Sequence, residues 1–307
     1  MEKVIVVIGP TSVGKTKMGV ALAKKFNGEV ISGDSMQIYK QMDIGTAKVT
    51  EEEKEGIIHH CVDILNPDET YSVHDFQQTV RKKITEITQR GHVPIIVGGT
   101  GLYIKAALYD YQFDEMENDH HAINEKYKDY TNEQLHDHLK SIDEESAKTL
   151  HFNNRRRVLR AIEIYETTGK RKSEMLEEQE HVCLYDAYFV GLTLPRDVLY
   201  ERINKRVDVM MKNGLKEEMD QLYSQGLTIN HQSMKAMGYK EWFDYYDHQI
   251  DLNEVLELIK KHSRQYAKRQ YTWFKNQFDV HWYDVNLEHF EQTIKQVTDD
   301  IEKILKI

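Results

Sequence analysis

Residues 9–16 have the sequence GPTSVGKT, which matches the phosphate-binding pattern G-x-x-x-x-G-K-[ST]. In such a loop the glycines let successive backbone N–H groups point at phosphate oxygens, and the lysine reaches the same anion. An apolar run precedes the loop and a segment of helical spacing follows it, which is the strand–loop–helix context that the pattern needs. We predict an anion-binding loop, with the Thr16 hydroxyl as the usual ligand of Mg²⁺, formed by Gly9, Pro10, Thr11, Ser12, Val13, Gly14, Lys15 and Thr16.

Asp34 is the second residue with chemical potential, because it directly follows the apolar segment Val30–Ser32 and Gly33. A carboxylate at a strand end beside a phosphate site has two functional interpretations. It helps to hold the metal, as in a Walker B strand, or it faces the acceptor and takes a proton. A turn-capping aspartate is the structural alternative.

Three further patterns leave alternatives open. Arg202 and Arg206 lie four apart on one helical face, which suits either a solvated face or a clamp on diphosphate charge. The segment Met234–Lys240 mixes methionine, glycine, tyrosine and lysine, which suits either core packing or RNA contact, and residues 264–270 interleave basic and aromatic side chains. The run His59-His60-Cys61 is predicted to be structural, because adjacent side chains of an extended segment point to opposite sides.

The elements that position these residues alternate strand and helix through the first hundred residues. Strands are expected at Val4–Ile8, Val30–Ser32, 94–97 and 187–194, and their apolar character predicts a parallel sheet covered on both faces. Helices are expected at 15–26, 72–91, 154–168, 195–211 and 253–278, and one rising from Thr131. The fold class is therefore α/β, a P-loop parallel sheet flanked by helices with an inserted all-helical domain. We expect residues 1–110 and 186–307 to form the catalytic core and 111–185 the insert.

The composition of the chain limits which partners the protein can bind. The formal net charge is −10, but residues 110–145 hold twelve acidic and three basic residues, whereas 151–172 hold seven basic and two acidic ones. A local basic surface can still meet a polyanion, because screening limits the reach of net charge to about 8–10 Å. The two cysteines form no CxxC pair, and no apolar run is long enough for a membrane span or secretory signal. We therefore expect a cytoplasmic protein with reduced cysteines, without membrane contact, and a monomer.

Seven stretches, in this order along the chain, resemble the tRNA dimethylallyltransferase (isopentenyl-tRNA transferase) family of bacterial type. They are GPTSVGKT, SGDSMQIYKQMDIGTAK, HHCVDI, PIIVGGTGLY, RRRVLRAIEIYETTGK, MKAMGYKEW and SRQYAKRQYTWFK. The departures from the family pattern, at Ser12-Val13, Gly33 and Lys235, remove no functional group. The C-terminal zinc finger of eukaryotic relatives is not found in this sequence.

The resemblance implies that a dimethylallyl group passes from its diphosphate to N6 of adenosine 37, beside the tRNA anticodon. Diphosphate is then the leaving group, held by the P-loop, Lys15, Arg206 and Mg²⁺ at Thr16, while Asp34 is the general base. Thr100 meets the target nucleotide, which must leave its stack to reach the crevice. The tRNA-binding set that follows comprises Asp34, Ser35, Met36, Gln37, Thr100, Arg155, Arg156, Arg157, Lys235, Ala236, Met237, Gly238, Tyr239 and Lys240.

Two other classes of protein remain compatible with the P-loop. A nucleoside or nucleotide kinase would use the same loop to bind ATP, and the arginine-rich insert could act as its lid. A non-catalytic RNA-binding regulator with a vestigial P-loop is a third class, against which the intact Lys15 and Thr16 speak. Whether ATP is ever bound is left open by the sequence.

Overall fold

The computed structural model describes residues 1–111, 120–177 and 181–306. It divides into two compact units. Met1–Tyr109 and Cys183–Ile307 form the core unit, and Asp110–Val182 form the insert. These bounds lie one to three residues from the expected ones. The acidic stretch 110–145 belongs to the insert, and its residues 112–119 lie outside the described residues. No helix among the described residues is long and apolar enough to cross a membrane.

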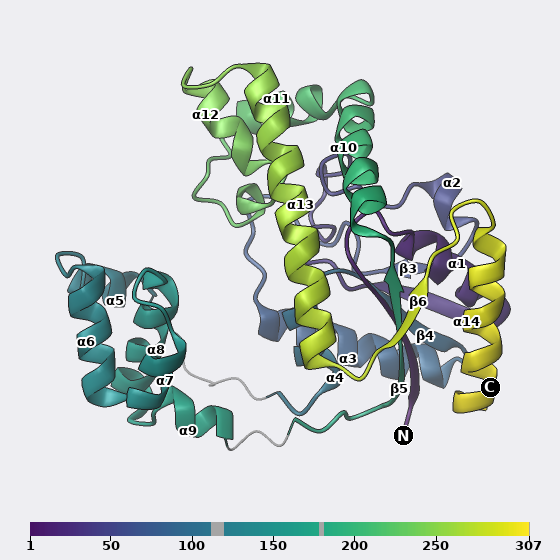
Figure 1. Cartoon of the computed structure of the whole chain (residues 1–307), viewed down its shortest axis with the longest axis horizontal. Helices are drawn as coiled ribbons and strands as arrows, with labels where there is room; N and C mark the ends of the chain where they lie inside the picture. Colours follow the sequence, from purple (N-terminus) through teal and green to yellow (C-terminus); the bar gives the residue numbers. More distant parts are fainter. Residues whose placement is uncertain (112–119, 178–180, 307) are drawn as a thin grey trace. The chain divides into compact units, whose positions relative to one another are not determined.

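The core unit is built on a six-stranded sheet in which neighbouring strands run parallel (Figure 1). Its strands are β1 (Lys3–Ile8), β2 (Gly28–Ser32), β3 (His59–His60), β4 (Val93–Val97), β5 (Asp186–Thr193) and β6 (His281–Asp284). The order across the sheet is β3-β2-β4-β1-β5-β6, so β1 lies centrally between β4 and β5. The carboxyl ends of β1, β2 and β4 therefore lie side by side, which is where ligands of open parallel sheets bind.

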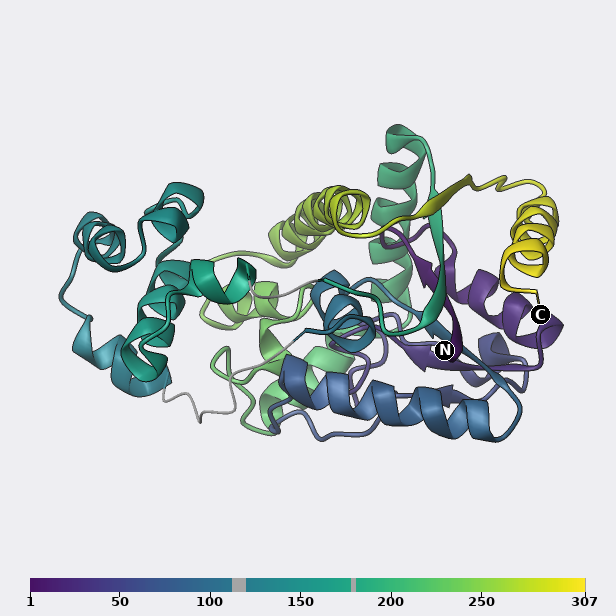
Figure 2. The same ribbon diagram turned by 90° about the horizontal axis from the view of Figure 1, so that it is seen from below.

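The central strand is apolar on both faces because both are covered. Val4, Val6 and Ile8 belong to one hydrophobic cluster, and Ile5 and Val7 belong to the other. The first cluster contains α3 (Val73–Gln89) and α4 (Gly101–Leu108). The second contains α1 (Lys15–Lys25) and α14 (Phe290–Leu305), which lie beside each other in Figure 2. The remaining helices of the core are α2 (Glu51–Lys54), α10 (Arg196–Lys212), α11 (Leu215–Ser224), α12 (Phe243–Tyr246) and α13 (Leu252–Gln277), with short 3₁₀ turns at Ser233–Lys235 and Lys240–Trp242.

The described residues of the insert form helices joined by turns, with no strand among them, and have their own small core. Its helices are α5 (His120–Lys126), α6 (Asn132–Ile142), α7 (Glu144–Thr149), α8 (Arg155–Thr168) and α9 (Lys172–Glu177). Apolar residues of α6 and α8 pack together, including Leu135, Leu139, Val158 and Ile162. Thr131 caps α6 in a capping box with Gln134, and Gly169 closes α8 in a left-handed conformation.

The predicted fold class is confirmed, and the expected elements lie within two residues of the observed ones. The Ser72–Asp75 capping box at the start of α3 is present as expected. Two edge strands were missed. The two-residue β3 is too short to produce a pattern, and β6 was included in a mostly helical C-terminal region. Edge strands are half-exposed, so their apolar signal is weak.

Candidate active site

Three loops that follow β1, β2 and β4 meet at one edge of the sheet. They carry the P-loop, Asp34 and Thr100, respectively. Gly33 N donates to Val97 O (2.8 Å) and Thr100 N donates to Gly33 O (3.2 Å), so the second and third loops are joined through their backbones. A Cβ at Gly98 would lie 2.3 Å from the backbone of Gly33, so this close approach requires glycine. The sheet edge thus brings Asp34 and Thr100 to the phosphate loop.

The P-loop has the backbone conformation of an anion cradle. Gly9 (φ 144°), Ser12 (φ 67°) and Gly14 (φ 107°) have positive φ, which turns consecutive amides toward the concave side. A Cβ at Gly9 would lie 2.5 Å from Leu192 O, so the loop also needs glycine for its packing on β5. Lys15 Nζ donates to Gly9 O (3.0 Å) and Pro10 O (2.8 Å), which holds this cation at the mouth of the cradle.

Two arginines of α10 contact the P-loop. Arg206 Nη1 donates to Thr11 Oγ1 (3.2 Å), and Arg202 Nε donates to Ser12 O (3.0 Å). Of the two alternatives left open by the sequence, a solvated face or a diphosphate clamp, these contacts favour the second. The cationic charge beside the cradle therefore comes from two distant parts of the chain.

Burial changes the ionisation of the groups that face one another here. The pKa of Lys15 is lowered to about 7, chiefly by desolvation and also by the charge of Arg206, while the charge of Asp34 opposes the shift. Burial also raises the pKa of Asp34 above its ordinary range, against the opposing effects of the Met36 N–H and the charges of Lys15 and Arg206. The positive charges of Lys15 and Arg206 exceed the negative charge of Asp34 beside them, which favours binding of a polyanion. The raised pKa makes Asp34 a better proton acceptor.

The Asp34 side chain is oriented by its own loop. Its Oδ1 accepts from Met36 N (2.9 Å), and Ser35 N donates to Thr100 Oγ1 (3.1 Å). Thr100 Oγ1 also lies 3.3 Å from Ser35 Oγ. These contacts fix residues 34–36 against the loop after β4.

Gln270 of α13 is a residue whose importance the sequence patterns did not reveal. Its Oε1 accepts from Thr11 N (2.9 Å) and its Nε2 donates to Gly99 O (3.0 Å), so one buried amide joins the P-loop to the loop after β4. The Tyr266 hydroxyl lies 3.4 Å from Gly99 O one turn earlier. The interleaved basic and aromatic pattern of 264–270 was the available signal, and it pointed to RNA rather than to this structural link.

Two cavities meet at these residues, and they differ in character. The first, of about 540 Å³, is lined by Thr16, Gln37 and Glu53 together with Val30, Val49, Val62, Val97 and Val209. The second, of about 510 Å³, is lined by Ser35, Met36, His262, Gln265, Tyr266 and Arg269 and by Lys235, Ala236, Met237, Gly238 and Lys240. Both include Lys15, Asp34 and Arg206. The first cavity is the richer in valine, each cavity is lined by five lysines and arginines, and the reactive groups line both.

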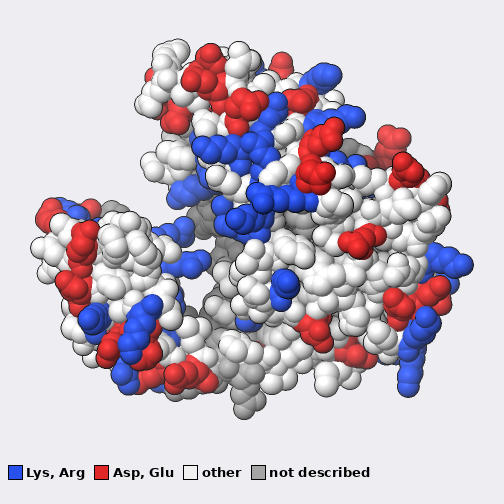
Figure 3. Space-filling view, in the orientation of Figure 1, with Lys and Arg blue, Asp and Glu red and all other residues white. Residues whose placement is uncertain are grey.

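The segment 235–240 is placed beside the second cavity, with one correction. Lys235 and Lys240 are exposed, and basic side chains gather over this part of α10 and α13 in Figure 3. Tyr239, however, is fully buried, does not line either cavity, and donates its hydroxyl to Glu218 (2.6 Å). The structure therefore places the Tyr239 side chain in the core and not on the surface where a contact with tRNA was expected.

The arginines of the insert differ from one another. Arg155 is half-buried, and its guanidinium donates to Tyr127 O (2.6 Å) and Tyr130 O (2.7 Å) within the insert. Arg156 and Arg157 are exposed. Arg155 therefore holds α8 to the turn between α5 and α6, whereas its two neighbours are presented to solvent.

The His59-His60-Cys61 run is not part of a metal centre in the described residues, which contain no suitable group of three ligands. His60 Nε2 contacts Glu29 (2.6 Å), and His59 Nδ1 contacts Ile57 O (2.9 Å). His59 also lines the first cavity. Glu29 is buried and contacts Arg90 and His92 as well. A structural role for His60 is what these contacts support.

The site combines a P-loop, the two arginines of α10 that contact it and the carboxylate of Asp34, all at one edge of a parallel sheet. Such a site defines an enzyme that acts on a phosphorylated substrate. The IPP transferase family model matches residues 37–277. The tRNA dimethylallyltransferases of Bacillus cereus (strain AH187) and Bacillus anthracis are each 54% identical over 287 residues. The match covers 92% of this chain in both cases, and 90% and 91% of those proteins.

Solved structures agree with this relationship. The tRNA delta(2)-isopentenylpyrophosphate transferase of Staphylococcus epidermidis is 47% identical, covers 99% of both chains and has a TM-score of 0.74. A eukaryotic dimethylallyltransferase acting on tRNA is 32% identical, with a TM-score of 0.86, over 99% of this chain and 79% of that chain. The chain belongs to the IPP transferase family. The family and the transferase class predicted from the motifs are confirmed, and the kinase alternative is not favoured.

Proposed function

We propose that this protein transfers a dimethylallyl group from dimethylallyl diphosphate to N6 of adenosine 37, beside the tRNA anticodon, and releases diphosphate. The observation that carries the proposal is the position of Asp34, which lines both cavities together with the cationic P-loop site. A donor held by its diphosphate and an acceptor nucleotide can therefore approach one carboxylate from two sides. The names of the relatives support the same substrates.

The first cavity suits the donor. Its valines offer an apolar surface to a branched five-carbon group, and the P-loop lies at its edge. As the allylic C–O bond breaks, negative charge develops on the diphosphate. Lys15, Arg206 and the amides of the P-loop stabilise this charge, together with the N-terminus of α1.

The residues present also fit Mg²⁺. Hydroxyl and carboxylate oxygens, the ligands that this ion prefers, line the first cavity at Thr16, Asp34 and Glu53. A cluster of three carboxylates is not needed, because Mg²⁺ in such sites keeps waters and takes oxygens from the substrate phosphates. Thr16 would hold the ion, which when bound neutralises charge on the diphosphate.

Asp34 is the proposed general base. The exocyclic amine is a poor nucleophile, and its proton must leave as the new N–C bond forms. Oδ1 accepts from Met36 N, and the Gln37 N–H also lowers the pKa of the carboxylate, whose remaining lone pairs can receive that proton. The carboxylate becomes a carboxylic acid, and the electron pair of the broken C–O bond leaves with the diphosphate.

The second cavity suits the nucleotide. Cations outnumber carboxylates among its lining residues, and Tyr266 provides an aromatic surface beside Thr100. Ser35, Met36 and Thr100 would contact the flipped adenine, and Gln37 would act from the first cavity, which it lines. We further propose that Lys235–Lys240 contact the anticodon stem–loop, and that Arg156 and Arg157 of the insert bind RNA phosphates.

The deciding experiment incubates the protein with radiolabelled dimethylallyl diphosphate, Mg²⁺ and unmodified tRNA. Label on adenosine 37 is the expected result, and a tRNA with another base at this position is the control. Consumption of ATP without labelled tRNA would favour the kinase instead. We expect a monomer acting in the cytoplasm, and size-exclusion chromatography with light scattering tests the first of these expectations.

A further inference from the structure

The segment Asp43–Ala47 is a wall of the site that has no regular secondary structure. Thr46 and Ala47 line both cavities, and Gly45 lines the second. Local hydrogen bonds run from Ala47 N to Ile44 O (2.9 Å), from Lys48 N to Asp43 O (2.9 Å) and from Thr46 Oγ1 to Met42 O (2.5 Å), and side chains from elsewhere complete its shape. The amides of three consecutive residues, Asp43 to Gly45, need acceptors that the segment does not supply.

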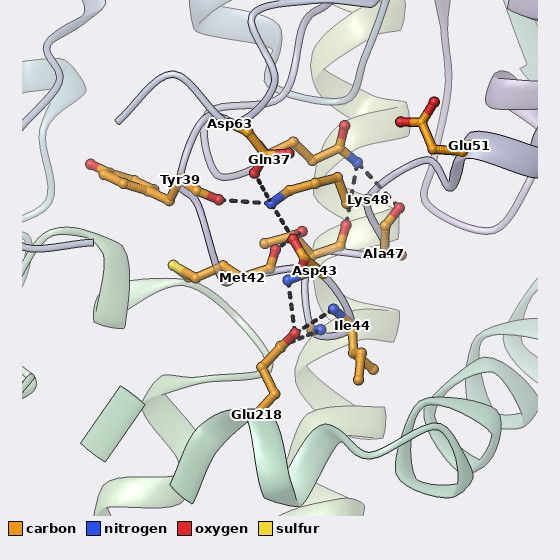
Figure 4. A network of polar contacts seen from close by, with 12 residues as sticks. Gln37, Tyr39, Met42, Asp43, Ile44, Ala47, Lys48, Glu51, Asp63 and Glu218 are labelled. Atoms are coloured by element: carbon orange, nitrogen blue, oxygen red, sulfur yellow. Dashed lines mark hydrogen bonds and ion pairs between the residues drawn. The ribbon is translucent and has the colours of Figure 1, made fainter. Parts of the chain in front are cut away.

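The two carboxylate oxygens of Glu218 on α11 accept from all three amides (Figure 4). Its Oε2 accepts from Asp43 N (2.8 Å) and Ile44 N (2.7 Å), and its Oε1 accepts from Gly45 N (3.0 Å). Bonds of backbone amides to an ionised carboxylate are stronger than neutral ones. A single side chain about 175 residues away in sequence therefore sets the conformation of this wall.

The same carboxylate also holds Tyr239. The Tyr239 hydroxyl donates to Glu218 Oε1 (2.6 Å), and burial together with the Glu218 charge raises the pKa of this phenol well above its ordinary value. The phenol therefore stays protonated and remains a donor. Its ring lies directly on Gly45, where an added Cβ would come within 2.5 Å of it. Glu218 thus joins the wall segment to Lys235–Lys240, the segment that carries the exposed lysines.

A lysine fixes the other side of the wall. Lys48 Nζ, which is buried, donates to Tyr39 O (2.8 Å) and Asp63 Oδ1 (2.6 Å), and it also pairs with the Asp43 carboxylate. Gln37 Nε2 donates to the carbonyls of Thr46 and Ala47 (both 3.3 Å). With the Lys48 side already anchored, Glu218 determines the part of the wall that faces the second cavity.

We propose that Glu218 is a positioning residue for the RNA substrate. It holds Gly45 and Tyr239 together so that the cationic segment Lys235–Lys240 is presented to RNA in a single shape. This inference rests on the proposed function, in which RNA enters the second cavity. Gly45 lines that cavity and not the first, and so do the neighbours of Tyr239, Lys235–Gly238 and Lys240. Loss of Glu218 should therefore affect tRNA more than the prenyl donor.

Substitution of Glu218 by glutamine has a defined structural consequence. An amide keeps one acceptor oxygen, so the NH₂ group must face either the amides of Asp43 and Ile44 or the pair formed by Gly45 N and Tyr239. In the second orientation the Tyr239 hydroxyl can turn and accept, but Gly45 N loses its acceptor. Glu218→Gln should therefore have a partial effect, and Glu218→Ala should have the larger one.

The test measures KM for tRNA, KM for dimethylallyl diphosphate and kcat with the full-length protein. Loss of a hydrogen bond to a charged acceptor reduces the population of the competent wall about tenfold or more, and apparent tRNA affinity falls with that population. We expect Glu218→Ala to raise KM for tRNA by about tenfold and Glu218→Gln by about threefold, with KM for the donor within about twofold. Tyr239→Phe keeps the ring on Gly45, removes one donor, and should resemble Glu218→Gln.

Two controls separate positioning from stability. Glu217→Gln makes the same chemical change at an exposed neighbour on α11, and it should leave every parameter unchanged. Amide hydrogen exchange at residues 43–45 should quicken in Glu218→Gln, which can be measured without any substrate. If Glu218→Ala does not fold, Glu218→Gln and Tyr239→Phe provide the test.

The outcomes are distinguishable. This inference alone is overturned if the wild-type protein labels tRNA but the Glu218 variants have a normal KM for tRNA. It is likewise overturned if their KM for the donor rises as much as their KM for tRNA. Unchanged exchange at residues 43–45 also overturns it. A wild-type protein that leaves tRNA unlabelled refutes the proposed function and this inference together.

Discussion

Replacement of Asp34 by asparagine tests the chemical step most directly. The structure makes this substitution conservative, because the Asn side-chain oxygen can still accept from Met36 N, as Asp34 Oδ1 does at 2.9 Å. The amide nitrogen then occupies the position of the second carboxylate oxygen. It cannot accept a proton at neutral pH, so the substitution removes the base while keeping the shape of the loop.

The expected loss follows from the role. A positioned general base contributes about 10²–10⁴-fold to the rate, so turnover of Asp34→Asn should fall by about that factor. Binding should change much less, because the diphosphate is held by the P-loop, Lys15 and Arg206. Removing the Asp34 charge also lowers the pKa of Lys15 further, since Asp34 raises it in the wild type. Donor binding is therefore best measured below about pH 7, where Lys15 is protonated in the wild type.

The assay is single-turnover transfer of label to tRNA, combined with equilibrium binding of donor and tRNA. Asp300→Asn is the matched control, since Asp300 is a half-buried carboxylate that accepts from Tyr283 (3.1 Å) on another part of the core. It should leave turnover within about twofold of wild type. Turnover of Asp34→Asn above about a tenth of the wild-type rate would refute the base assignment. A large loss of donor affinity with little loss of rate would indicate a metal-holding role instead.

Three further predictions follow from the electrostatics. Because desolvation lowers the pKa of Lys15 to about 7 in the free protein, the charge of this side chain is present below that pH and lost above it. Donor affinity measured by calorimetry should therefore decline above about pH 7, and Lys15→Arg should remove the decline. Hydrogen bonds from Arg90, His60 and His92 outweigh burial and lower the pKa of Glu29 to about 2. Its contribution to the free energy of unfolding, up to about 3 kcal/mol, is therefore present above its ordinary value of 4.5 and lost as the pH falls toward 2; acid denaturation of Glu29→Gln should show a shallower pH slope, and an unchanged slope would contradict this. Replacing Arg156 and Arg157 together by alanine should flatten the salt dependence of tRNA binding by about one unit per lost phosphate contact without changing donor affinity, and an unmoved slope would exclude phosphate contacts by these arginines.

Much of this protein was determined by local sequence. The P-loop is a continuous segment of eight residues that includes all of its glycines, its lysine and its threonine, so the spacing of residue types was sufficient to predict it. The strands of the sheet are continuous apolar runs, and the capping boxes at Ser72 and Thr131 depend on residues three apart. The order of the seven long motifs likewise identified the family. Each of these signals is a property of neighbouring residues.

Only the tertiary structure decided which polar groups serve the site and which hold the fold. Gln270 joins the P-loop to Gly99 across more than 170 residues, and Glu218 caps a segment about 175 residues away. Tyr239 and Arg155 lie within motifs predicted to contact RNA, yet one is a core residue and the other bonds to carbonyls of the insert. A tyrosine, glutamate or arginine has the same hydrogen-bonding groups whether it faces solvent or protein. Its role depends on which donors and acceptors the packing of distant elements leaves unpaired beside it, because a buried amide or carbonyl must find a partner.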